Sequence, residues 1–137
     1  MPGFSFKKGE RLSSRKVISS LFQSGKTIHS GPLKVRWEKG KGLPFPAAMA
    51  VSVPKRVHKR AADRNLLKRR IREAYRINKP VFYTGLIERG EQVHLVIQYQ
   101  QQEVLDYKTI EAGLLKALDQ LFADLGKTVP GSPKPAP

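Results

Sequence analysis

Cysteine is absent from this chain of 137 residues, which excludes disulfides, thiolate metal sites and thiol nucleophiles. Long apolar runs are absent as well, because none approaches the roughly 20 residues that a membrane-spanning helix requires. The first residues, MPGFSFKKGERL, lack the apolar segment of a signal peptide. From these absences we expect a cytoplasmic protein that has no membrane partner.

Groups that could build an active site are sparse. The histidines His29, His58 and His94 are far apart and lack the spacing of metal ligands. His58 has cations on both sides in sequence, so we expect it to add to a basic surface. The 11 acidic residues are scattered and form no pair suited to two-metal hydrolysis. Phosphate-binding glycine motifs are also missing. We therefore expect another molecule to carry out any reaction in which this chain takes part.

Positive charge is what the chain has in excess. It contains 26 Lys and Arg against 11 Asp and Glu, a formal net charge of +15. A charge of this size favours a nucleic acid or an anionic membrane as partner, with fast and salt-sensitive association, and of the two we expect a nucleic acid. The apolar fraction of 39% is enough for a core, and the length predicts one domain.

The charge is concentrated in residues 55–79, where eleven Lys or Arg stand against two acids. Placed on a helix at about 100° per residue, the apolar side chains share one arc. They are Leu67, Ile71, Ala74 and Tyr75. The neighbouring arc holds an amide and four cations, which are Asn65, Lys68, Arg69, Arg72 and Arg76. We predict a helix that buries one side and presents a cationic flank to a polyanion.

A charge-rich helix can also be a solvated face that binds nothing. Solvated faces usually mix the two signs, with Glu placed four residues before Lys. Here only Glu73 could serve, with Arg69 or Arg76. The remaining like charges repel one another by roughly a few tenths of a kcal/mol per pair. We therefore favour a polyanion surface, because a bound polyanion would offset that repulsion.

Two further helices are predicted. The first is capped by Ser13 or Ser14 and ends at Gly25, which we expect in the left-handed conformation. The last begins after Asp106 and is closed by Gly126. Its buried side is predicted from apolar residues at helical spacing, which are Ile110, Leu114, Leu118, Leu121 and Leu125.

The basic helix carries Asp63 near its first turn, where a carboxylate suits the helix dipole. We expect it to end near Asn78, because Pro80 disfavours helix in the residue before it. Residues 81–90 are then either a short helical extension or a loop.

Three segments have strand patterns, namely residues 33–37, 47–53 and 93–99. The first alternates, so that Leu33, Val35 and Trp37 share one face and Lys34 and Arg36 share the other. Trp37 could stack on a base, but a lone Trp in a small domain is more often part of the core. The cationic face is a plausible second contact for nucleic acid.

The order of elements predicts an α+β fold, a small single-domain α/β sandwich of order α-β-β-(β)-α-β-α in which the bracketed strand is not placed. We assign residues 11–126 to this domain. Residues 1–10 are an N-terminal arm, either lying on the domain or flexible, and residues 127–137 are a disordered Pro-rich tail.

The basic region resembles the signature of the bacterial ribonuclease P protein subunit. That family has a strand ending in Ser-Val-x-Lys-Lys/Arg, a basic loop, and an Arg-Asn-Arg helix with a Lys-Arg pair and a further Arg. The matching residues are Ser52, Val53, Lys55, Arg56, Arg64, Asn65, Lys68, Arg69 and Arg72. Arg11 and Leu12, with Phe22, Gly25 and Lys26, also fit. Leu66 departs from the family, which usually has a second Arg there, and we expect Arg70 to replace it in part.

The resemblance implies both a fold detail and a function. The detail is a left-handed βαβ crossover into the last strand. The function is that of the protein subunit of a ribonucleoprotein endoribonuclease, with one protein per RNA. Its basic helix and loop bind the catalytic RNA, and a cleft between the first helix and the open sheet face holds the 5′ leader of precursor tRNA. Cleavage is by the RNA with Mg²⁺, which is bound mainly by the RNA.

Site candidates follow from the matched positions and the neighbouring cations. Those for the RNA subunit are Lys55, Arg56, Lys59, Arg60, Arg64, Asn65, Lys68, Arg69, Arg72 and Arg76. Those for the leader cleft are Phe22, Lys34 and Arg36. Phe22 has a second interpretation as a core residue of the first helix, which its apolar stripe favours. Two other functions stay open, a structural RNA-binding protein of ribosomal type and a protein-only enzyme.

Overall fold

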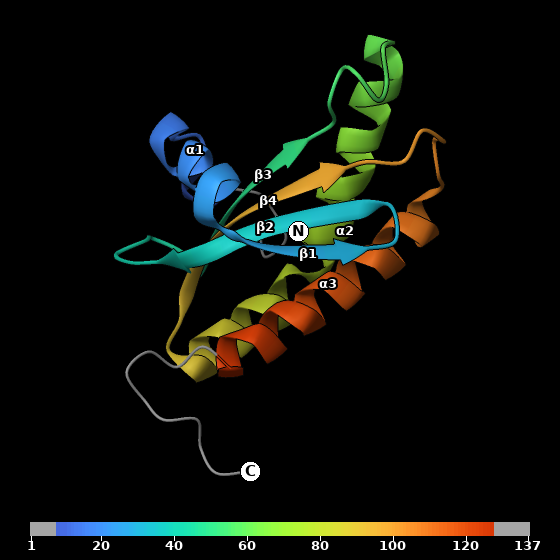
Figure 1. Cartoon of the computed structure of the whole chain (residues 1–137). Helices are drawn as coiled ribbons and strands as arrows, with labels where there is room; N and C mark the ends of the chain where they lie inside the picture. The colour runs from blue at the N-terminus through green and yellow to red at the C-terminus, as the bar shows by residue number, and fades with distance from the viewer. Residues whose placement is uncertain (1–7, 128–137) are drawn as a thin grey trace.

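Figure 1 shows the computed structural model of the chain, in which the structure describes residues 8–127. The elements in chain order are the 3-10 helix η2 (Lys8–Glu10), α1 (Arg15–Ser24), β1 (Lys26–Ser30), β2 (Leu33–Gly40), β3 (Ala47–Ser52), α2 (Ala61–Arg89), β4 (Gln92–Tyr99) and α3 (Tyr107–Lys127). Most of the predicted arm and of the predicted tail therefore lies outside the described residues. Within residues 8–127, no helix has a segment long and apolar enough to span a membrane.

The four strands form one sheet in the order β1-β2-β4-β3. β2 pairs antiparallel with β1 and β4, whereas β3 and β4 are parallel neighbours. α2 and α3 cover one face of the sheet, and α1 lies on the other (Figure 1). The α+β prediction is confirmed, and α2 makes the expected crossover between the parallel strands β3 and β4. The left hand of that crossover stays a prediction.

The core lies between the sheet and the helix pair α2 and α3. The predicted apolar arc of the basic helix is fully buried there, from Leu67 and Ile71 to Tyr75. The inward face of β2 meets it with Leu33, Val35 and Trp37, all buried. The core interpretation of Trp37 is therefore confirmed. The predicted buried residues of the last helix are confirmed as well.

The prediction that the basic helix ends near Asn78 is wrong. α2 has 29 residues and passes through Pro80. A proline inside a helix costs about 3 kcal/mol, partly through one lost backbone hydrogen bond. The next turns bury Phe82 and Leu86, and burying a large apolar side chain contributes roughly 1.5–3 kcal/mol each time. Packing therefore outweighs the local cost. The helix ends at Arg89, and Gly90 follows as the C-cap with φ +65°.

The ends of the other helices agree with the predictions in part. Ser14 caps α1 by accepting from the Val17 N–H at 3.3 Å. Asp106 caps α3 by accepting from the Thr109 N–H at 2.9 Å. α3 continues through Gly126 to Lys127, so that glycine does not close it. The bracketed strand is β1, which periodicity missed because only Ile28 is buried in it.

Gly25 was expected in the left-handed conformation, and this is wrong. Its φ of −68° and ψ of 156° are extended. A Cβ added at this position would lie 2.7 Å from the backbone oxygen of Leu21. Glycine is thus favoured here by close approach of the preceding turn rather than by a positive φ.

Candidate nucleic-acid interface

Residues 54–60, here called the basic loop, connect β3 to α2. The N–H groups of Val57 and His58 both donate to the Pro54 carbonyl at 3.1 Å, which turns the loop back on itself. The loop presents four exposed cations, which are Lys55, Arg56, Lys59 and Arg60. None of these four forms an ion pair with a carboxylate within residues 8–127. The loop is therefore a compact set of positive charges open to solvent.

The first turns of α2 continue this positive surface. Asn65, Arg69 and Arg72 are exposed and Lys68 is half-buried. In the part of the chain that the structure describes, no carboxylate pairs with Lys68, Arg69 or Arg72. α2 also begins without a side-chain cap, since Arg60 holds the N-cap position. The loop and these turns together are called the cationic face below.

Arg76 stands apart from the other predicted candidates because it is paired within the protein. Its Nη2 lies 2.6 Å from Glu73 Oε2, and its Nε lies 3.1 Å from Oε1. The hydrogen bond to Arg76 lowers the pKa of the Glu73 carboxyl and raises the pKa of Arg76 in turn. The positive charge of Arg76 is thus partly neutralised before any RNA binds.

Two other arginines of α2 are held by backbone carbonyls. Arg64 Nη1 donates to the carbonyls of His58 at 2.9 Å and Lys59 at 2.8 Å, which joins the basic loop to the first turn of α2. Arg70 Nη1 donates to the Leu105 carbonyl at 2.5 Å, in the loop before α3. Arg70 was expected to replace the family arginine at position 66, but its guanidinium lies against the protein.

His58 does not add to the basic surface, contrary to the prediction. Only 5% of it is exposed, and its Nε2 lies 2.7 Å from the Gln101 carbonyl oxygen. Its ring packs on Tyr99 with 5.6 Å between centroids. The flanking cations gave no hint of this burial, because the partners come from a distant segment.

The sheet face opposite the main core carries the predicted leader-cleft residues. Lys34 and Arg36 of β2 lie beside Gln98 and Val96 of β4 on this face. α1 covers part of it by packing Leu21 against Ala48 and Val96. Lys34 and Arg36 are half-buried and alternate with the buried Leu33, Val35 and Trp37, so the predicted alternation of β2 is confirmed.

Phe22 of α1 meets Arg36 at the edge of the covered region. The guanidinium carbon of Arg36 lies 4.8 Å from the centroid of the Phe22 ring, a cation–π contact. Phe22 is 41% exposed, so its interpretation as a core residue is wrong. Leu21 fills the buried position, and the next residue of a helix points about 100° away from it. The three cleft candidates thus lie on one side of the sheet.

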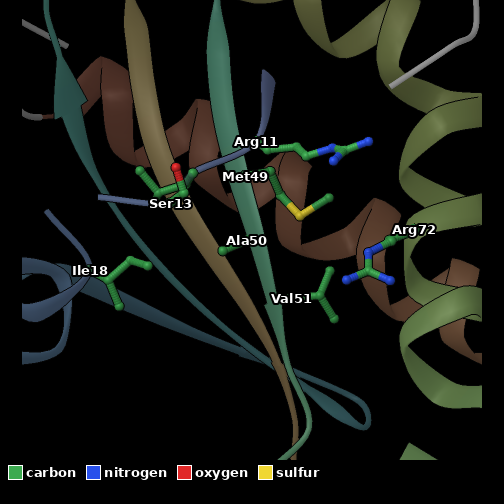
Figure 2. Close-up of a pocket in the computed structure, with 8 residues that line it drawn as sticks. Arg11, Ser13, Ile18, Met49, Ala50, Val51 and Arg72 are labelled. Atoms are coloured by element: carbon green, nitrogen blue, oxygen red, sulfur yellow. The ribbon is translucent and has the colours of Figure 1, made fainter. Parts of the chain in front are cut away.

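A groove of about 590 Å³ lies between the N-terminal segment, α1, β3 and α2 (Figure 2). Arg72 reaches from α2 toward Val51, and Arg11 extends past Met49 into the same region (Figure 2). The Leu12 N–H donates to the Met49 carbonyl at 3.0 Å, which places Arg11 beside the edge strand. Arg11 lines this groove and is absent from the predicted site residues, although it had matched the family pattern. Its place depends on this pairing with β3.

Fold and surface together define a class of protein, a small α+β domain with a strongly cationic face suited to a polyanion. Comparison with known proteins narrows that class. The family model Ribonuclease P matches residues 6–122. The ribonuclease P protein component of Porphyromonas gingivalis is 36% identical over 125 residues, which cover 90% of this chain and 91% of that protein. The chain belongs to the ribonuclease P protein family, and the resemblance seen in the sequence is confirmed.

Solved structures agree with this assignment. The RNase P protein from Thermotoga maritima is 25% identical, with a TM-score of 0.65 over 81% of this chain and 96% of that one. The RNase P protein of Staphylococcus aureus has a TM-score of 0.67 over 82% of this chain and 94% of that one. At 18% identity the second likeness concerns the fold alone.

Proposed function

We propose that this chain is the protein subunit of a ribonucleoprotein endoribonuclease that removes the 5′ leader of precursor tRNA. It acts by binding two RNAs, and the RNA subunit carries out the cleavage. Membership of the ribonuclease P protein family supports this proposal. The observation that carries it is the cationic face, whose charges have no carboxylate partners within residues 8–127.

The cationic face binds the RNA subunit in this proposal. Cations that bind phosphates release condensed counterions, which makes the affinity strong and salt-dependent. The basic loop, Lys68, Arg69 and Arg72 supply most of these contacts. Arg64 and Arg76 contribute less, because one holds the loop and the other is paired with Glu73.

The open sheet face binds the 5′ leader. A single strand suits such a surface, because its bases can stack on exposed rings while cations follow its backbone. Phe22 supplies a ring and Arg36 and Lys34 supply the charges. By binding leader and catalytic RNA at once, the protein lowers the repulsion between two polyanions.

Metal chemistry is assigned to the RNA in this proposal. Within residues 8–127, no three His, Asp or Glu side chains come together in a group that could hold a metal ion. No step is therefore routed through a protein-bound metal, and Mg²⁺ is held mainly by the RNA. One protein per RNA and a cytoplasmic location complete the proposal.

Reconstitution tests it. The full chain is mixed with a bacterial ribonuclease P RNA transcript and precursor tRNA at a Mg²⁺ concentration too low for the RNA alone. The expected result is restored cleavage at the mature 5′ end, with the RNA alone and the protein alone inactive. Absence of any effect would favour a structural RNA-binding protein instead. Cleavage by the protein alone would establish a protein-only enzyme.

A further inference from the structure

The basic loop combines exposed cations with a buried histidine. Four of its side chains are exposed cations that repel one another, yet His58 in their midst is almost fully buried. Repulsion of this kind favours an open, variable loop. Since the structure shows a compact loop, its shape depends on contacts made by His58 and the backbone around it.

His58 holds the loop from one side through its ring. Its Nε2 lies 2.7 Å from the Gln101 carbonyl oxygen, and because a carbonyl only accepts, Nε2 carries the proton. Packing of the ring on Tyr99 adds an apolar contact. Arg64 of α2 also binds the loop, by donating to the carbonyls of His58 and Lys59. The loop is thus fixed between α2 and residues 100–106.

Residues 100–106, here called the anchor segment, are themselves held firmly. The Tyr99 hydroxyl donates to the Glu103 carbonyl at 2.5 Å and accepts from the Leu105 N–H at 3.1 Å. Arg70 binds the Leu105 carbonyl from α2. The parallel strands β3 and β4 place the basic loop and the anchor segment at the same end of the sheet (Figure 1). The anchor segment is therefore ordered by its own contacts and lies next to the basic loop.

We propose that His58 is a positioning residue, which fixes the basic loop to the anchor segment and sets the spacing of its four cations before RNA binds. The inference rests on the proposed function, because the loop is taken to contact the RNA subunit. A loop that is already ordered loses little conformational freedom on binding, so more of the interaction shows as affinity. His58 itself touches no RNA.

Two matched variants separate the hydrogen bond from the bulk of the ring. His58→Phe keeps a ring against Tyr99 but has no donor for the Gln101 carbonyl. His58→Gln keeps an N–H donor at a similar reach. In the full chain without RNA, we expect His58→Phe to raise backbone hydrogen exchange in residues 54–60 by about two- to ten-fold, the effect of losing one net hydrogen bond. His58→Gln should restore exchange close to that of the unmodified chain.

RNA binding gives the second measurement. Affinity of His58→Phe for the ribonuclease P RNA transcript should fall by about two- to ten-fold, and His58→Gln should recover most of it. The slope of log affinity against log salt should stay unchanged, because every cation is still present. Arg56→Ala is the contrast, since the loss of one phosphate contact should reduce that slope by about one. If His58 had a purely structural role, His58→Phe would lower the melting temperature without lowering the affinity for the transcript.

The inference would be overturned if His58→Phe showed the same hydrogen exchange in residues 54–60 and the same RNA affinity as the unmodified chain. A changed salt slope would overturn it as well. Should His58→Phe fail to fold, Tyr99→Phe replaces it, because it releases the anchor segment while keeping the ring. The same faster exchange in residues 54–60 is then expected, and normal exchange would contradict us. If the unmodified chain fails to bind the transcript, the proposed function fails, and the exchange comparison still decides the role of His58.

Discussion

Lys79 and Glu10 form a buried ion pair, in which Nζ lies 2.9 Å from Oε2. Only 6% and 2% of the two side chains are exposed. Burial raises the pKa of Tyr83, and its protonated hydroxyl donates to the same Glu10 oxygen at 2.6 Å. The pair joins η2 to α2, and the next residue, Arg11, lines the groove beside β3. A cation of the basic stretch thus serves to hold the N-terminal segment in place.

Lys79→Met should destabilise the protein by about 3–5 kcal/mol, because it leaves the Glu10 carboxylate buried without its cation. The double variant Glu10→Gln with Lys79→Met removes both charges and should recover much of that loss. Urea unfolding measures the free energies. Arg69→Met, at an exposed position of the same helix, is the control and should change stability by no more than about 0.5 kcal/mol. A single variant as stable as this control would show that the pair contributes nothing.

Charge reversal on the cationic face should weaken RNA binding and flatten its salt dependence. Lys68→Glu combined with Arg72→Glu removes two cations of α2 that pair with no carboxylate within residues 8–127. The slope of log affinity against log salt should fall by about one for each lost phosphate contact. Lys116→Glu, on the exposed side of α3, serves as the control and should change the slope little. An unchanged slope for the double variant would remove this flank from the interface.

The sequence predicts the position of a side chain well when its partners are near it in the chain. Local periodicity was sufficient for the helix itself, because Leu67 and Ile71 recur at helical spacing and are buried as predicted. It was sufficient for β2 too, where alternation separated Trp37 from Arg36. Both patterns depend on residues that are neighbours in sequence.

To tell basic side chains that face solvent from those that hold the fold, one must know their long-range contacts. Sequence periodicity does not predict such contacts. The partner of His58 is 43 positions away, that of Arg70 is 35 positions away, and that of Lys79 is 69 positions away. In the sequence, nothing distinguishes these three residues from the neighbouring basic residues that face solvent. The helix end at Pro80 was predicted wrongly for a similar reason, because Phe82 in the next turn packs on Phe122 of the distant helix α3.

Phe22→Ala should weaken binding of the 5′ leader while leaving the fold intact. Stacking of a base on an aromatic ring is worth about 1–3 kcal/mol, and the Phe22 ring is available because much of it is exposed. Affinity of the reconstituted enzyme is compared for precursor tRNA with and without a leader, and only the first should fall. Val81→Ala trims an exposed apolar side chain of α2 and should leave both affinities unchanged. Equal losses for the two substrates would argue against a leader contact.

Gly25→Ala and Gly25→Asn should destabilise the protein to a similar extent. Any Cβ would lie 2.7 Å from the Leu21 carbonyl oxygen, and relieving such a contact typically costs about 1–3 kcal/mol. If a positive φ were the reason for glycine, Asn would be tolerated better than Ala. Gly126→Ala is the control, because within residues 8–127 no neighbouring group lies within 4 Å of a Cβ placed there. Urea unfolding of the three variants separates the two causes.

His94 should make stability depend on pH between neutrality and mild acid. Burial lowers the pKa of His94 below 6.5, and the Glu38 carboxylate opposes this only in part. Its Nδ1 is buried and has no hydrogen-bond partner within residues 8–127. The unfolded chain keeps the ordinary pKa and so binds more protons than the folded protein just below pH 6.5. Stability from this group is therefore present above pH 6.5 and is lost as the pH falls.

His94→Gln removes the titration, so its free energy of unfolding should drop less between pH 7.5 and 5.5 than that of the unmodified chain. Equal drops would mean that the ring is hydrated when the protein is folded.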